Sequence, residues 1–123
     1  MAQTFGGQMR LTLGDGTRLA IRGSFSIEDS GIKVESEKNL DRSMARIVSL
    51  KNYKMDVDLE LPSTIGSDAV LSYEGDATVV EDHTGVMHLF SNGFFTGDPK
   101  TDRMKGVTTG LAFESVGYRK VAK

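Results

Sequence analysis

The sequence from residue 9 to residue 27 is MRLTLGDGTRLAIRGSFSI, and it decides the fold class. Apolar and polar residues alternate on both sides of the dipeptide Asp15-Gly16. Such alternation is typical of a half-buried strand, and Asp-Gly is favoured in tight hairpin turns. We therefore predict a β-hairpin over residues 9–27.

Further strands follow from the same alternation. Residues 55–61 are MDVDLEL, a strand with one apolar and one acidic face that Pro62 ends. Residues 77–80 and 86–95 predict two strands joined by a turn at 81–85. The sequence Gly-Asp-Pro at 97–99 predicts a loop over 97–102. The last strand is predicted over 106–118, with one face formed by Val107, Thr109, Leu111 and Phe113.

Residues 63–71 are compatible with a short helix. Ser63 would be its N-cap, although Gly66 is a weak helix former. The residues expected to face inward are Ile65, Ala69 and Val70.

The polar segment over residues 28–52 allows two interpretations. A helix with Asn39 as N-cap would place on one side Leu40, Met44, Ile47 and Val48. A long extended arm is favoured instead by the β-branched pair Ile47-Val48 and by the alternation of Ile32 with Val34. Periodicity does not decide between the two.

Together these segments predict a mostly β fold: an antiparallel β-barrel or sandwich with one short flanking α-helix and a long extended arm. A chain of 123 residues forms one domain with a core of its own, spanning residues 1–123. There is no cysteine, no apolar run near the roughly 20 residues that span a bilayer, and no apolar secretory segment at the N-terminus. We expect a protein of the cytoplasm or of a particle assembled there.

Charge is distributed unevenly along the chain. Residues 1–54 hold nine basic and six acidic side chains, residues 55–99 hold nine acidic and no basic ones, and residues 100–123 hold six basic and two acidic ones. The net charges are +3, −9 and +4. Either folding mixes these charges, or the surface has separate acidic and basic sides.

The sequence holds little that indicates catalysis. His83 and His88 have no thiolate beside them, so we expect no metal site and no cofactor. Alternate carboxylates on one strand face lie about 6.6 Å apart, a spacing that glycosidases use, but the chain lacks tryptophan to bind a sugar. We predict no catalytic residues and a solvated acidic face. Stable nucleic-acid binding is not expected, since the strand region is acidic.

Residues 89–99, LFSNGFFTGDP, and 106–115, GVTTGLAFES, resemble the tail tube proteins of Mu-like, contractile-tailed phages. In that family a strand runs into a Gly-x-Pro loop and a glycine-rich last strand follows. The glycine-rich N-terminus, the hairpin and the polar arm near residues 31–52 are similar in layout.

The resemblance implies a structural protein, not an enzyme: six copies close a ring, and rings stack into a hollow tube. It implies as partners the chain itself, a sheath, baseplate or tail-terminator proteins and a tape-measure protein. Double-stranded DNA would pass without specific binding, and no membrane would be involved. The protein would belong to the virion tail, assembled in the host cytoplasm. Tubes of type VI secretion and of bacteriocins share this architecture. The alternative is a monomeric β-barrel that binds a small ligand.

Three groups of candidate residues follow. An acidic lumen would be formed by Asp56, Asp58 and Glu60, and further by Glu74, Asp76, Glu81 and Asp82, because an acidic bore does not retain a polyanion. Contacts between rings would come from the arm residues Lys33, Glu35, Glu37, Lys38, Asp41, Arg42 and Arg46. Phe94 and Phe95 point to opposite sheet faces, so one belongs to the core and the other is buried either by a second layer or by a neighbouring subunit.

Overall fold

The structure, a computed structural model, describes residues 7–62 and 64–122. Within these residues the chain forms eight strands and one short helix. In chain order they are β1 (Met9–Leu13), β2 (Arg18–Glu28), β3 (Ile32–Lys38), β4 (Met44–Leu50), β5 (Tyr53–Glu60), α1 (Ser67–Leu71), β6 (Glu74–Glu81), β7 (Val86–Asp102) and β8 (Val107–Val121).

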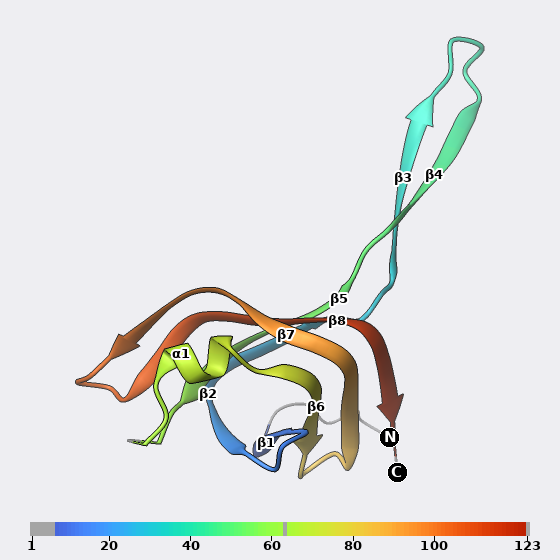
Figure 1. Ribbon diagram of the computed structural model, residues 1–123. Helices are drawn as coiled ribbons and strands as arrows, with labels where there is room; N and C mark the ends of the chain where they lie inside the picture. The colour runs from blue at the N-terminus through green and yellow to red at the C-terminus, as the bar shows by residue number, and fades with distance from the viewer. Residues whose placement is uncertain (1–6, 63, 123) are drawn as a thin grey trace.

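Six of the described strands close an antiparallel barrel in the order β1-β2-β5-β8-β7-β6. β1 pairs with β2 on one side and with β6 on the other, which closes the barrel. β3 and β4 form a separate ribbon that projects from the barrel as an arm (Figure 1). The predicted mostly β fold, with one short helix and a long extended arm, is confirmed.

The predicted hairpin is formed by β1 and β2. Gly16 has a φ of 94°, and the Asp15 carboxylate accepts the backbone N–H of Thr17 at 2.9 Å. A positive φ costs glycine little, so the Asp-Gly dipeptide closes the turn without strain.

The arm is extended, not helical. β3 and β4 pair in register from Ile32 opposite Leu50 to Lys38 opposite Met44. Asn39, the candidate helix N-cap, donates its amide to the Ser43 hydroxyl at 3.0 Å within the connecting turn. Helical spacing here was misleading, because β-branched residues and a stable turn favour the ribbon.

The helix is shorter than predicted. It spans Ser67–Leu71 with Gly66 at the N-cap position, and the predicted N-cap Ser63 lies outside the described residues. Val70 is buried and Ile65 partly buried, as expected, but Ala69 is exposed. Five residues make little more than one turn, so such a helix cannot turn all its apolar residues inward.

The predicted loop over residues 97–102 is wrong, because β7 continues through it to Asp102. The register shifts between Gly97 and Lys100, where Asp98 and Pro99 lie opposite the single residue Gly110. A β-bulge of this kind accommodates a proline, which has no N–H to donate to the ladder. Gly97 has a φ of 118°, and a Cβ on it would lie 2.1 Å from the Gly110 carbonyl oxygen. Glycine is therefore required there, and the chain turns at residues 103–106 instead.

A second bulge, in β8 itself, changes the predicted inner face of that strand, because Thr109 and Gly110 lie opposite the single residue Asp58 of β5. Leu111 and Phe113 are buried as expected, whereas Thr109 is exposed and Val107 only half-buried. Thr108 is buried instead, and its hydroxyl lies 3.0 Å from that of Thr101. An extra residue reverses the alternation of the strand before it.

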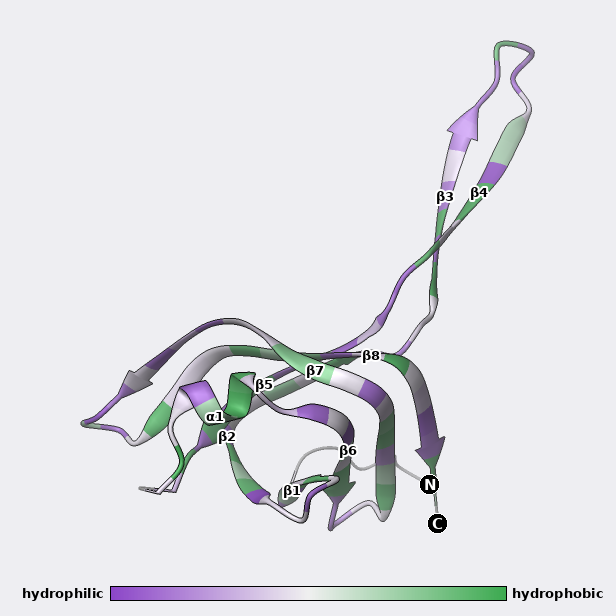
Figure 2. Cartoon of the chain, in the orientation of Figure 1, coloured by the Kyte–Doolittle hydropathy of each residue, from purple (hydrophilic) through white to green (hydrophobic). Residues whose placement is uncertain are grey.

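The core fills the barrel, and Figure 2 shows hydrophobic and hydrophilic positions alternating along its strands. Its aromatic centre is Phe113, whose ring lies 5.0 Å from that of Phe95 and 6.0 Å from that of Phe90, both edge-on. The buried apolar residues are Leu11, Leu13, Leu19, Met55, Val57, Leu59, Val70, Ala77, Val79, Phe90, Phe95, Leu111, Ala112 and Phe113. Every one of them belongs to the barrel or to α1.

Candidate assembly surface

The outer face of β5 carries the predicted row of carboxylates. Asp56, Asp58 and Glu60 alternate with the buried Met55, Val57 and Leu59. Asp58 accepts the Ser24 hydroxyl at 3.1 Å, and one Asp56 oxygen lies 3.9 Å from the Lys54 ammonium. The three acids therefore share one solvent-facing strip of the barrel.

The other four candidate acids lie on β6 or directly after it, and most have local partners. Asp76 accepts the backbone N–H of Asn92 at 3.0 Å and so satisfies a bulge in β7. Asp82 forms a 2.8 Å ion pair with Arg10. Glu74 is exposed at the start of β6. Since β6 pairs with β1 and β7 and not with β5, these acids do not extend the β5 row.

Glu81 is not a surface acid. Its side chain is 14% exposed and contacts Nε2 of His88, whose Nδ1 lies 2.8 Å from the Tyr118 hydroxyl. Burial raises the pKa of Tyr118. His88 is thus satisfied inside the barrel, while His83 lies in the turn after β6. Among the described residues no group of three or more histidines, cysteines or carboxylates gathers to hold a metal.

Two acids that the sequence analysis missed lie on the same side of the barrel as the β5 row. Glu28 on β2 and Glu114 on β8 both stand opposite Lys54 in register. Alternation along the strand could have revealed Glu114, because the residue after an inward-facing Phe113 faces outward. The acidic side is therefore assembled from three strands that are distant in sequence.

One register row on the barrel wall carries an arginine at each of its two ends. Register places in one row across β8, β7, β6, β1 and β2 the residues Arg119, Leu89, Thr78, Thr12 and Arg18. This row ends in an arginine on both sides and holds no acid. The row therefore differs in charge from the acidic strip, but its two arginines are separated by three strands and form no basic side.

Phe94 and Phe95 point to opposite faces, as predicted. Phe95 is buried against Phe113, whereas Phe94 is 51% exposed on the outer face of β7. Val116 on β8 is 68% exposed and borders the same shallow depression as Phe94. Two large apolar side chains are thus exposed side by side on the barrel.

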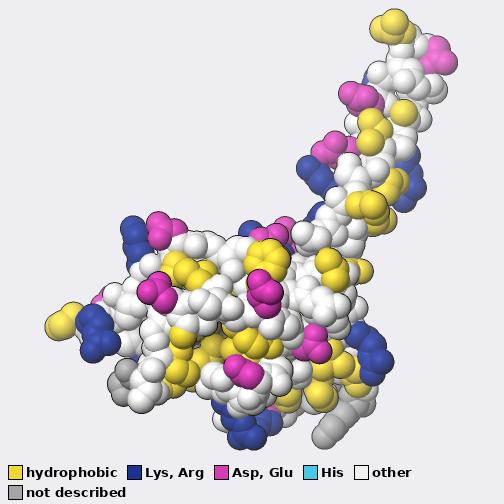
Figure 3. All heavy atoms as spheres, in the orientation of Figure 1, with side chains coloured by type: hydrophobic (Ala, Val, Ile, Leu, Met, Phe, Trp, Pro, Cys, Tyr) yellow, Lys and Arg dark blue, Asp and Glu magenta, His cyan; other side chains and the backbone are white. Residues whose placement is uncertain are grey.

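All the predicted charged residues of the arm are exposed to solvent. Figure 3 shows charged and apolar side chains interspersed along the arm. Lys33 and Glu35 form a 2.8 Å ion pair. The Ser43 hydroxyl and backbone N–H donate to the Asp41 carboxylate, which lowers the pKa of Asp41. Arg42 has a φ of 73° within this turn. Glu37, Lys38 and Arg46 lie on the two strands.

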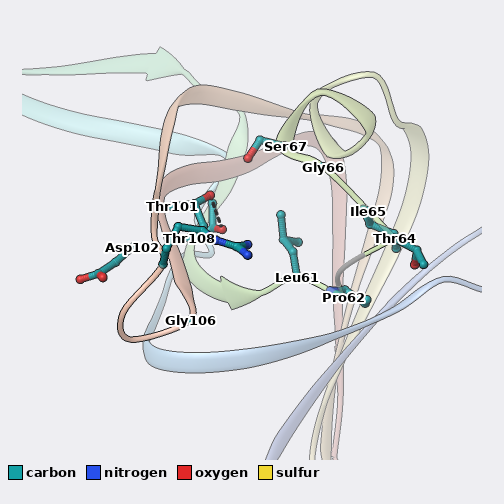
Figure 4. Close-up of a pocket in the computed structure, with 11 residues that line it drawn as sticks. Leu61, Pro62, Thr64, Ile65, Gly66, Ser67, Thr101, Asp102, Gly106 and Thr108 are labelled. Carbon is teal, nitrogen blue, oxygen red and sulfur yellow. Dashed lines mark hydrogen bonds between the residues drawn. The ribbon is translucent and has the colours of Figure 1, made fainter.

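A groove of about 410 Å³ lies between the segment before α1 and the end of the β7–β8 hairpin. Figure 4 shows Thr101 and Thr108 facing each other at this groove, with Leu61 and Ile65 on the opposite segment. Asp102, which also lines it, accepts the backbone N–H groups of Met104 and Lys105 at 2.9 and 3.2 Å. That carboxylate shapes a turn, so the groove offers no evident acid–base pair for catalysis.

Solved structures of low sequence identity share this fold. A chain of the PVC sheath/tube terminator of an extracellular contractile injection system, in its extended state, matches with a TM-score of 0.68 and 12% identity over 99% of each chain. A chain of the PVC sheath-tube complex matches with a TM-score of 0.62 and 13% identity, over 94% of this chain and 89% of that one. Hcp1 from Flavobacterium johnsoniae matches with a TM-score of 0.62 and 8% identity, over 95% of this chain and 97% of that one.

The chain shares the fold of these three structures. At identities of 8 to 13% this likeness defines the fold and extends over nearly the whole chain. No family model matches the chain, and no curated protein matches it in sequence.

The shared fold gives the sequence resemblance a structural basis. Residues 89–99 lie in β7 and residues 107–115 in β8, the two longest strands, which pair with each other along most of their length. The resemblance to contractile tails is therefore supported at the level of the fold. No helix among the described residues is long and apolar enough to cross a membrane.

Proposed function

We propose that this chain is the structural subunit of a tube in a contractile, phage-like device. Six copies close a ring, and rings stack into a hollow tube. The observation that carries the proposal is the exposed arm, which projects from the barrel and holds apolar side chains that none of the described residues covers. Such surfaces in a folded protein mark contact sites. The fold shared with sheath/tube proteins supports this role.

The arm joins one ring to the next in this proposal. A ring is a closed heterologous assembly, and stacking extends it along the axis. The remaining partners are a sheath around the tube, baseplate or terminator proteins at its ends and a tape-measure protein within it. The protein would then reside in the tail of a virion or in a related injection or secretion device, and it would act by assembly and not by catalysis.

Electron microscopy of concentrated protein tests this function. We expect rings and tubes, and in size-exclusion chromatography with light scattering a species of about six times the 13.4 kDa chain mass. A chain that stays at 13.4 kDa and binds a small ligand would contradict the proposal and favour the β-barrel binding module.

A second candidate function is a tube terminator. The PVC sheath/tube terminator matches the chain over 99% of both lengths. The two candidates differ in self-association: a tube subunit forms rings that stack into long polymers, whereas a terminator forms rings that do not stack on each other. Polymer length in the same micrographs separates them.

The lumen of the proposed tube is lined by Asp56, Asp58 and Glu60. These acids form a continuous strip, and Glu28 on β2 lies on the same side of the barrel. Repeated around each ring, the strip would give the bore a negative potential. Double-stranded DNA carries about one charge per 1.7 Å, and a basic bore would retain it through counterion release. An acidic bore lets a polyanion pass.

Charge reversal tests the lumen. Tubes that carry Asp56→Lys and Asp58→Lys are expected to assemble and to retain short duplex DNA, with retention falling steeply as salt rises. Wild-type tubes should retain none. The matched control, Asp68→Lys with Asp15→Lys, changes the net charge equally at exposed positions on α1 and in the turn between β1 and β2. If the control retains as much DNA as the β5 variant, the β5 acids do not line the bore.

A further inference from the structure

The two faces of the arm differ in chemistry. Cross-strand partners lie on the same side of a ribbon. Register therefore places on one face Ile32, Val34, Ser36, Lys38, Met44, Arg46, Val48 and Leu50. This apolar–basic face holds five large apolar residues, two basic ones and no acid. The opposite face holds Lys33, Glu35, Glu37, Ala45, Ile47 and Ser49. Both carboxylates of the paired strands, Glu35 and Glu37, therefore lie on this opposite face.

The apolar–basic face is open to solvent. Its five apolar side chains are between 42% and 89% exposed. A shallow groove of about 390 Å³ lies on the arm, lined by Val34, Glu35, Ser36, Met44, Ala45 and Arg46. A two-stranded ribbon without a covering layer is marginal in water. The arm therefore needs a partner surface, and that surface must be apolar with acidic flanks.

The barrel carries one surface of that kind on β7 and β8. Phe94 stands in register between Glu74 on β6 and Glu114 on β8, so a half-exposed aromatic ring has a carboxylate on either side. Val116 adds a second apolar side chain. We call these four residues the Phe94 patch. Its composition complements the arm: apolar residues match apolar residues, and two acids match the basic Lys38 and Arg46.

We propose that the apolar–basic face of one arm lies on the Phe94 patch of a second copy of this chain. The arm projects away from its own barrel, so the partner is another molecule (Figure 1). The acidic face of the arm then stays in water, where Glu35 pairs with Lys33. This inference rests on the proposed tube, and it adds which face of the arm makes the contact and which surface receives it.

Disulfide trapping tests the contact, because the chain has no native cysteine. Two singly substituted proteins, Val48→Cys and Val116→Cys, are mixed, assembled and oxidised. We expect a covalent dimer that holds one copy of each, identified by mass spectrometry of its linked peptides. The matched control is Ile47→Cys mixed with Val116→Cys. Ile47 is the neighbouring residue, similarly exposed at 38% against 46%, but lies on the opposite face. Its dimer yield should be at least about tenfold lower.

Charge exchange provides a second measurement. Glu74→Lys with Glu114→Lys should weaken assembly, and combination with Lys38→Glu and Arg46→Glu should restore it, because both signs are then exchanged. Tubes that form without a Val48–Val116 link, or that link equally through Ile47, would overturn this inference and leave the tube intact. If wild-type protein forms neither rings nor tubes, the proposed function fails and this contact fails with it.

Discussion

A chain in which Glu35–Ile47 is replaced by Asn-Gly is expected to fold and to form no tubes. None of the buried core residues lies within β3, β4 or their turn, so the barrel loses no packing. Asn-Gly favours a two-residue turn of the type that joins antiparallel strands, and it retains the pair formed by Val34 and Val48. The shortened arm lacks Met44, Arg46 and Lys38, which the proposed contact requires.

Circular dichroism and thermal unfolding should show a β-rich protein with a melting temperature close to that of the wild type, while sedimentation and electron microscopy show no polymer. The matched control keeps the arm at full length and exchanges one ion pair, Lys33→Glu with Glu35→Lys, on the acidic face. It should polymerise normally. Normal tubes from the shortened variant would mean that the arm does not join the rings.

Local patterns predicted the elements whose faces are fixed by their own residues. The hairpin of β1 and β2 and the strand β5 follow from strict alternation, because one side of each faces the core. The continuation of β7 did not follow. Gly-Asp-Pro is typical of a loop, but pairing with Gly110 turns it into a bulge within a strand. Residues 98–99 and Gly110 are apart in the sequence, so a local sequence pattern cannot predict that they pair.

The candidate acids show the same limit. Residues 55–99 contain no basic residue, and from the sequence alone their carboxylates cannot be told apart. In the barrel only those on β5 form a row, whereas Glu81 is buried with His88 and Asp76 satisfies a bulge. The acidic side is completed by Glu114, which lies in the basic C-terminal segment. Surface charge is set by which strands are neighbours in the sheet, and that order differs from the order in sequence.

The adjacent residues Phe94 and Phe95 should respond very differently to truncation. Phe95→Ala removes a ring that packs edge-on at 5.0 Å from Phe113, so it leaves a cavity in the core. Such changes cost about 3–5 kcal/mol, a large part of the roughly 5–15 kcal/mol that stabilises a typical domain. We expect the melting temperature to fall on the order of 10–20 °C. Phe94 is 51% exposed, and Phe94→Ala should leave monomer stability within about 1 kcal/mol of the wild type.

Assembly should respond in the opposite order, which separates a core residue from a contact residue. Phe94→Ala removes the centre of the Phe94 patch, and truncation of an aromatic anchor in an interface typically costs about 2 kcal/mol or more per contact. Because every copy repeats the contact, the concentration at which tubes form should rise more than tenfold, measured by light scattering on protein that is fully folded by circular dichroism. Phe95→Ala should still assemble below its lowered melting temperature. Equal loss of stability in both variants would place Phe94 in the monomer core and remove the receiving surface for the arm.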